Sequence, residues 1–385
     1  MIRIAILSLS MLTVMSGAAV APAVADIIAY FPNASDMLGK MVLTTPALTI
    51  IPMALITGLL SSRVARKSLV YTGIFFYMLG GAGGGLATSI PFLLSMRAVL
   101  GIGVGILMPL STGIIADIWS GDEKAKIMGL ASASSNLGGI IAMLLSGMLA
   151  AVSWRASFLI YLLGIAVWVL IFFFLPEKHP SPVEKRQSSQ GIGFLGSYIR
   201  WGLGMFLLMV AFYSIPVNIA LYLQSHEIGD SRMAGLAMAV MTASSFLTGL
   251  TYGNLKKALR GWLSSVSLLI FALSYYGLST FPSALPLFCS LVLNGMAFGT
   301  LVPSIMDGVT RTAENSSGTA GTSVVTSFLF AGQFASPLIT GETSGLIFGS
   351  GISNIYLTLA CGVGLACIFS VVFRITTAKR VQLTT

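Results

Sequence analysis

Long apolar segments separated by short polar turns run through almost the whole chain. Each holds about twenty residues, the length at which an α-helix crosses the hydrocarbon core of a bilayer. The pattern predicts an all-α membrane protein with twelve transmembrane helices. The predicted segments are residues 4–28, 38–60, 68–88, 91–116, 127–150, 155–175, 198–224, 232–254, 262–281, 284–308, 317–340 and 352–373.

The longest polar interval, PEKHPSPVEKRQSSQG at residues 176–191, divides the segments into two sets of six. Its prolines, serines and charged residues cannot bury apolar area, so the interval predicts a linker. We expect an N-terminal six-helix bundle at residues 1–176, a linker at 177–196 and a C-terminal six-helix bundle at 197–385.

Composition narrows the class of protein further. Of the 385 residues, 56% are hydrophobic and 9% are charged, and the mean hydropathy of +0.92 exceeds what a water-soluble core can hide. The net charge of +9 does not indicate nucleic-acid binding, because Lys and Arg occur in short clusters between apolar segments. Three cysteines and two histidines lack the spacing of metal ligands, so we expect no metal, no cofactor and no catalytic residues.

The basic residues predict how the segments are oriented. Of the 21 Lys and Arg, seventeen fall on one side of the predicted helices and three on the other, and Arg97 lies within a helix. In membrane proteins the cytoplasmic loops carry the excess of Lys and Arg. We expect a multi-pass protein of the cytoplasmic (inner) membrane with both termini and the linker in the cytoplasm.

The first segment also looks like a secretory signal peptide, with Arg3 before the apolar run and Ala23-Val24-Ala25 before Asp26. An internal repeat favours a retained transmembrane helix instead, because a shift of 194 residues places Pro22 on Pro216 of the seventh segment. The other identities at this shift are Asp36 with Asp230, Thr57 with Thr251, Arg66 with Arg260, Gly101 with Gly295, Gly105 with Gly299, Pro109 with Pro303, Gly138 with Gly332 and Gly147 with Gly341.

Four motifs in the N-terminal half resemble those of the major facilitator superfamily. GLLSSRVARK, residues 58–67, is similar to the family's loop between helices two and three, although Ser62 stands where the family usually has Asp. RAVLGIGVG from Arg97 resembles the family's helix four, and SWRASF, residues 153–158, resembles the opening of helix six. ADIWSGDEKAKIMG resembles the loop after helix four and places Asp117 at the family's acidic position. The first loop keeps Gly58, Arg63, Arg66 and Lys67 of the signature.

The resemblance implies two bundles related by a pseudo-twofold axis and transport by alternating access, in a fold that works as a monomer. It also implies that the basic residues of this loop face Asp117 and clasp the inner ends of the two bundles when the protein opens outward. The alternative is that these charges only set topology. The repeat copy GNLKKALR, residues 253–260, has Lys257 where an acid would fit, so we expect only the first copy to latch.

Few ionisable side chains lie within the predicted helices, where each one is costly without a partner. Asp26 and Arg97 lie at similar depth on segments one and four, so we predict that they pair. This pair is either a proton switch or a permanent ion pair. Asp307 is a second candidate for proton coupling, with Arg311 one turn later at a spacing that permits a local pair.

The segments that line the cavity of the family carry uncharged polar and aromatic residues among many methionines. Such linings adapt to varied apolar shapes, so we expect a small amphiphilic or weakly polar substrate. For any one of these polar groups a hydrogen bond between helices is the alternative. The substrate candidates are Ser16, Asn136, Tyr213, Asn218, Tyr222, Asn294 and Gln333.

These observations predict a secondary active transporter whose partners are a small molecule, protons and the lipid bilayer. The end of segment one and the chain length resemble drug:proton antiporters and their sugar-efflux-like relatives, although SSNLGG, residues 134–139, lacks the proline of the exporters' G-P-x-L-G-G motif. Efflux is favoured over an uptake permease or a sugar-efflux type carrier. A membrane enzyme or a transport-dead sensor is the alternative from another class, and no set of catalytic residues within the segments supports an enzyme.

Overall fold

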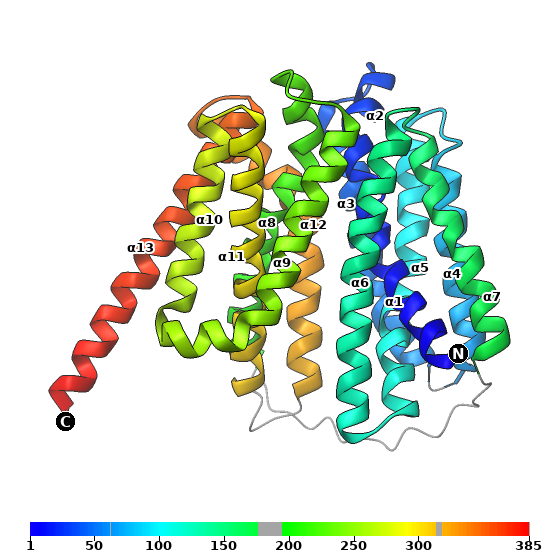
Figure 1. Cartoon of the computed structure of the whole chain (residues 1–385), viewed down its shortest axis with the longest axis horizontal. Helices are drawn as coiled ribbons and strands as arrows, with labels where there is room; N and C mark the ends of the chain where they lie inside the picture. The colour runs from blue at the N-terminus through cyan, green and yellow to red at the C-terminus, as the bar shows by residue number, and fades with distance from the viewer. Residues whose placement is uncertain (62, 176–194, 313–317, 385) are drawn as a thin grey trace.

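The computed structural model describes residues 1–61, 63–175, 195–312 and 318–384, and within these ranges the chain forms helices and no strand (Figure 1). Ser62 and most of the predicted linker lie outside the described residues. The helices are α1 Ile2–Ala18, η1 Ala21–Ala23, α2 Val24–Tyr30, α3 Asp36–Leu60, α4 Arg66–Gly84, α5 Ile90–Ile118, α6 Gly121–Ala150, η2 Ala156–Leu162, α7 Leu163–Phe174, α8 Leu195–Ser225, α9 Ser231–Leu259, η4 Arg260–Trp262, α10 Leu263–Thr280, α11 Ala284–Thr312, α12 Gly318–Ile347 and α13 Ile352–Thr384.

Ten described helical stretches are long and apolar enough to cross a membrane. One of them, Ser231–Thr280, contains both α9 and α10, and α4 is not among the ten. Large apolar side chains such as Leu159, Leu207 and Phe369 are exposed, which suits an outer surface in contact with lipid.

The first predicted segment is broken into α1, η1 and α2. Pro22 lies in the break and has no N–H to donate, and the Ala23 N–H bonds to the Val20 carbonyl in a tighter turn. Within this segment Ala19, Val20 and Ala25 are buried, and α1 packs against α5 and α6. Most of residues 4–28 therefore lie in the interior of the molecule.

Glycines let neighbouring helices approach closely, and they do so at equivalent places in the two halves of the repeat. A Cβ at Gly101 or Gly105 of α5 would collide with the backbone of α3. A Cβ at Gly295 or Gly299 of α11, each 194 residues later, would collide with the backbone of α9. The repeat in the sequence thus corresponds to a repeat in helix packing.

We name the two ends of the helical array after residues that lie there. The Asp26 end holds the end of α2, the start of α3, the end of α6 and the start of α9. The Arg66 end holds the end of α3, the start of α6 and the end of α9, and both chain termini lie toward it (Figure 1).

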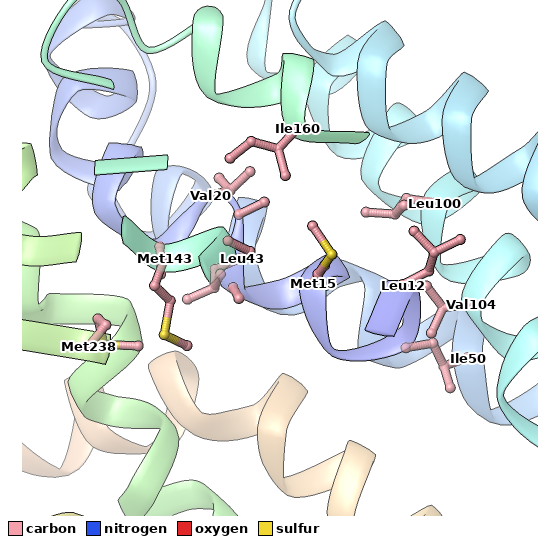
Figure 2. Packing of buried hydrophobic residues seen from close by; sticks show 14 of the residues in the cluster. Leu12, Met15, Val20, Leu43, Ile50, Leu100, Val104, Met143, Ile160 and Met238 are labelled. Carbon is pink, nitrogen blue, oxygen red and sulfur yellow. The ribbon is translucent and has the colours of Figure 1, made fainter. Parts of the chain in front are cut away.

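The N-terminal part, residues 2–175, meets the C-terminal part, residues 195–384, mainly where α6 packs on α9 and α3 packs on α12. All buried residues of α9 fall within residues 231–241, in the half of the helix nearer the Asp26 end. Figure 2 shows Met143 of α6 beside Met238 of α9 in this region. The two parts are therefore closed together at the Asp26 end.

Two glycines make a close approach between the parts. A Cβ at Gly147 of α6 would lie 2.7 Å from the Ser231 carbonyl oxygen and 3.0 Å from the Gly235 Cα. Small residues at such a crossing allow van der Waals contact between helix backbones, which is a main source of helix association in lipid.

We expect Gly147→Ala to weaken closure at the Asp26 end by about 1–3 kcal/mol, the usual cost of overpacking a tight contact. Spin labels at Val152 and Leu346, both exposed near this end, should report a shift toward longer distances. Gly129→Ala on the same helix is the control, because no atom lies within 4 Å of its added Cβ. Equal distance distributions in the two variants would contradict the prediction.

Candidate functional site

A cavity of about 350 Å³ lies between the two parts of the chain. No acidic or basic side chain lines it among the described residues. Its polar lining consists of Thr13, Ser16, Asn136, Tyr213, Thr242, Ser245 and Gln333. Its aromatic and thioether lining consists of Phe212, Phe298, Phe330, Met108, Met143, Met209, Met238 and Met241.

A second cavity of about 290 Å³ adjoins the first and is lined by α3, α5 and α12. The two cavities share Ile50, Met108 and Phe330. The second reaches toward the Arg66 end through Leu55, Thr112 and Thr322. The hollow between the parts thus extends toward the end at which they are not closed together.

Four of the predicted substrate residues line the central cavity, namely Ser16, Asn136, Tyr213 and Gln333. The side chains of Tyr213 of α8 and Gln333 of α12 lie close together in the cavity wall.

The other three, Asn218, Tyr222 and Asn294, are buried outside the cavity lining. Each donates a hydrogen bond within the C-terminal part: Asn218 to the Ser214 carbonyl at 2.8 Å, Tyr222 to the Leu278 carbonyl at 2.7 Å, and Asn294 to Ser274 Oγ at 2.9 Å. The bonds of Tyr222 and Asn294 match the alternative of a hydrogen bond between helices, whereas Asn218 bonds within α8.

Arg97 of α5 is fully buried, and its partners are neutral. Its Nε donates to the Val42 carbonyl at 3.0 Å, its Nη2 to the Ser16 carbonyl at 3.0 Å and its Nη1 to the Tyr161 hydroxyl at 2.7 Å. Tyr161 donates in turn to the Ser16 carbonyl at 2.7 Å. No carboxylate of the described residues forms an ion pair with Arg97, so the predicted pairing with Asp26 is wrong.

The backbone explains why these carbonyls accept from Arg97. Pro46 has no N–H, so the Val42 carbonyl four residues earlier in α3 has no helical donor. Ser16 lies in the last turn of α1, where carbonyls lose their helical partners. A carbonyl without a hydrogen bond is costly in hydrocarbon. The Arg97 guanidinium donates to both of these carbonyls and so replaces the helical donors that they lack.

Asp26 makes its contacts with the C-terminal part. Its carboxylate oxygens accept from Ser231 Oγ at 2.5 Å and from Gln224 Nε2 at 3.1 Å. Ser231 begins α9 and Gln224 lies at the end of α8, so the carboxylate joins the two parts at their closed end. The repeat in the sequence pairs Asp36 with Asp230, the residue before Ser231. No feature of the sequence identifies Ser231 as a hydrogen-bond partner of Asp26.

At the Arg66 end, Arg66 of α4 forms an ion pair with Asp117 of α5, as expected. Lys67 instead donates to the Phe172 carbonyl at 3.0 Å, and Arg63 and Gly58 are exposed. The ion pair joins two helices of the N-terminal part, so in this structure it does not link the two parts.

The repeat copy of this loop also forms an ion pair, within the C-terminal part. Lys256 of α9 lies 2.8 Å from the Asp307 carboxylate of α11, and Arg311 lies 3.1 Å from the same oxygen. The i,i+4 pair of Asp307 with Arg311 was expected from the spacing. The contact of Lys256 with Asp307 was not predicted, because the two residues lie far apart in the sequence.

The sequence matches a known protein family over most of its length. The model of the Major Facilitator Superfamily matches residues 6–337. This chain belongs to the Major Facilitator Superfamily. It is a multi-pass membrane transporter and not an enzyme.

Several members of the superfamily resemble it in sequence. Multidrug resistance protein 3 of Bacillus subtilis (strain 168) is 26% identical over 182 residues, 47% of this chain and 33% of that protein. Multidrug resistance protein 1 of the same strain is 23% identical over 329 residues, 83% of this chain and 84% of that protein. The arabinose-proton symporter of Escherichia coli (strain K12) is 29% identical over 133 residues, 34% of this chain and 28% of that protein. The chain thus spans about a third of the length of the first and third of these relatives.

Solved structures agree on the fold. A bacterial homologue of the human lysosomal transporter Spinster, in an inward-facing and unoccupied conformation, superposes with a TM-score of 0.76. The match covers 98% of this chain and 95% of that one at 18% identity. The helices of this superfamily member are therefore arranged in the fold of known transporters.

The Arg97 cluster predicts how two buried tyrosines should differ. Tyr161→Phe removes a hydroxyl that accepts from a charged donor and donates to a carbonyl, so we expect a loss of about 1.5–3 kcal/mol in stability. Tyr77→Phe is the matched control. The Tyr77 ring packs on the Tyr161 ring with a centroid distance of 5.5 Å, and the buried Tyr77 hydroxyl has no hydrogen-bond partner among the described residues. Thermal unfolding in detergent should show a lower midpoint for Tyr161→Phe alone; similar midpoints would contradict the assignment.

Proposed function

We propose that the protein is a secondary active transporter that moves a small amphiphilic or weakly polar molecule across the cytoplasmic membrane by alternating access. The cavity between the two parts carries the proposal, because it is closed toward one end and extends toward the other. A substrate held there would reach the opposite side of the membrane if closure moved from the Asp26 end to the Arg66 end.

The proposal includes twelve membrane crossings in two six-helix bundles, residues 1–176 and 197–385, joined by the linker at 177–196. The ten apolar stretches give twelve crossings if Ser231–Thr280 crosses twice, as α9 and α10, and if α4 crosses as well. The excess of Lys and Arg at the Arg66 end supports a cytoplasmic location for that end and for both termini. The central cavity in this state would then face the cytoplasm.

We propose that Asp26 couples the cycle to protons through its bonds to Ser231 and Gln224. As a carboxylate it accepts from both donors across the interface. Hydrogen bonds to a charged group contribute about 1.5–3 kcal/mol each, against about 0.5–1.5 kcal/mol for neutral groups. Protonation of Asp26 would therefore weaken closure at this end. Arg97 and Asp307 remain candidates for coupling, but each is already held within one part of the chain.

Asp26→Asn tests this role. The amide keeps the size of the side chain but carries no charge and does not titrate, so we expect transport driven by a pH gradient to fall at least tenfold while exchange without a gradient persists. Asp36→Asn, an exposed acid at the same end, should behave as the unmodified protein. Both fluxes would be measured in proteoliposomes, and gradient-driven flux that survives in Asp26→Asn would exclude Asp26 as the coupling site.

We propose efflux as the direction of transport, supported by similarity to the two multidrug resistance proteins and by the apolar, methionine-rich lining. The alternative is an uptake permease or a sugar-efflux type carrier for a small polar solute. Similarity to the arabinose-proton symporter and the polar groups Asn136 and Gln333 favour that alternative.

A flux assay in proteoliposomes of known protein orientation separates these functions. With an imposed pH gradient we expect amphiphilic aromatic compounds to move against the direction of proton flow. Movement of pentoses or hexoses together with protons would support the alternative. A lack of gradient-driven movement for every compound would reject secondary transport.

A further inference from the structure

We propose that the central cavity selects a monovalent organic anion with an apolar aromatic body and rejects organic cations of the same shape. This inference rests on the proposed transport function and specifies the substrate class. Its basis is the charge of Arg97, which no acid of the described residues neutralises.

The guanidinium lies directly behind the cavity wall. Ser16 lines the cavity and accepts from Arg97 through its carbonyl, and Leu43, which follows Val42, lines the cavity from α3. A full positive charge held by two carbonyls and a phenol in a medium of low dielectric creates a positive potential nearby, since neutral dipoles orient around a charge but do not cancel it.

The opposite wall supplies no matching negative charge. Leu291 occupies the position 194 residues after Arg97, and the rest of the cavity lining in the described chain is uncharged. That wall is aromatic instead, with Phe212 and Phe298 stacked at a centroid distance of 3.6 Å. An anionic group near Ser16 and a flat apolar body on these rings would match both walls.

The acids nearest in sequence to this region are engaged elsewhere. Asp26 lies ten residues beyond Ser16, and its neutral partners Ser231 and Gln224 leave its charge in place. It is only half-buried at the rim, however, so water screens its field more than that of the fully buried Arg97. Asp36 and Lys40 lie together in the first turns of α3 and carry opposite charges. Among the described residues Arg97 is the one charged side chain that is buried, so its field is the least screened next to the cavity.

The approach to the cavity has the same sign. Among the described residues the Arg66 end carries twelve Lys and Arg against four Asp and Glu. Such an excess attracts anions to the opening and repels cations. The usual excess of Lys and Arg in cytoplasmic loops is enough to explain these surface residues. Selection between anions and cations inside the cavity is therefore assigned to the buried guanidinium of Arg97.

Three naphthalene compounds of one shape and different charge test the inference: 2-naphthoate, 2-naphthylmethanol and 2-naphthylmethylammonium. Binding to the purified full chain in detergent at pH 8 would be measured by isothermal titration calorimetry. We expect naphthoate to bind at least tenfold more tightly than the alcohol and the ammonium compound to bind most weakly. Equal or tighter binding of the ammonium compound, or no binding by any of the three, overturns the inference.

Arg97→Gln is a poor test, because it leaves the buried carbonyls of Val42 and Ser16 without their donor. A loss of binding in this variant could then result from misfolding. Gln333→Glu places a negative charge on the cavity wall beside Tyr213 with almost no change in volume. We expect it to abolish the preference for naphthoate and to favour the ammonium compound. Gln333→Met, which removes the amide without adding charge, should keep the order of the unmodified protein.

The failure of this inference can be told apart from the failure of the proposed function. Preference for cations in the binding assay, together with gradient-driven flux in proteoliposomes, leaves a transporter with another substrate class. Preference for anions without any flux leaves a selective binding site and rejects transport.

Discussion

The interaction on which the N-terminal part depends is the one between Arg97 and the backbone carbonyls of Ser16 and Val42. Lipid offers no partner to a free carbonyl, so a proline in α3 and the end of α1 both create a demand that a side chain has to meet. Arg97 meets both from α5 and thereby holds three helices at one point. A single guanidinium thus compensates for two interruptions of regular helix, and those interruptions give α1 and α3 their shape beside the cavity.

At the equivalent place in the C-terminal part the side chains that donate to backbone carbonyls are uncharged. Val210, which lies 194 residues after Ser16, accepts from Ser336 Oγ at 2.7 Å, and the next carbonyl, that of Ala211, accepts from the Tyr275 hydroxyl at 2.7 Å. A carbonyl that accepts from a side chain thus recurs at this position of the repeat, while the donors differ. With a guanidinium behind one wall and hydroxyl donors behind the other, the two walls of the cavity are electrically unlike.

The helices, their order and the repeat could be predicted from the sequence, because spans of about twenty apolar residues and glycines such as Gly101 and Gly295 reflect constraints that act locally. The partners of the buried charges could not. Similar depth suggested that Asp26 and Arg97 pair, but depth says nothing about rotation around a helix axis, and Asp26 faces Ser231 across the interface. Pro46 was the available signal for Arg97, since the carbonyl four residues before a proline always lacks its helical donor.

The contacts that close the Asp26 end differ in kind from those that hold each part together. Gly147 and Gly235 join the parts through backbone contact, and Asp26 adds two hydrogen bonds at the rim. In lipid no hydrophobic effect drives helices together, so an interface of this composition is held by packing and a few polar bonds. Such an interface can open without exposing an unpaired charge deep in the membrane, because the rim carboxylate can be hydrated or protonated. Arg97 is fully buried and can be neither hydrated nor relieved of its charge. Its acceptors, Val42 and Ser16, lie in the same part of the chain, so opening of the interface between the parts would leave its hydrogen bonds intact.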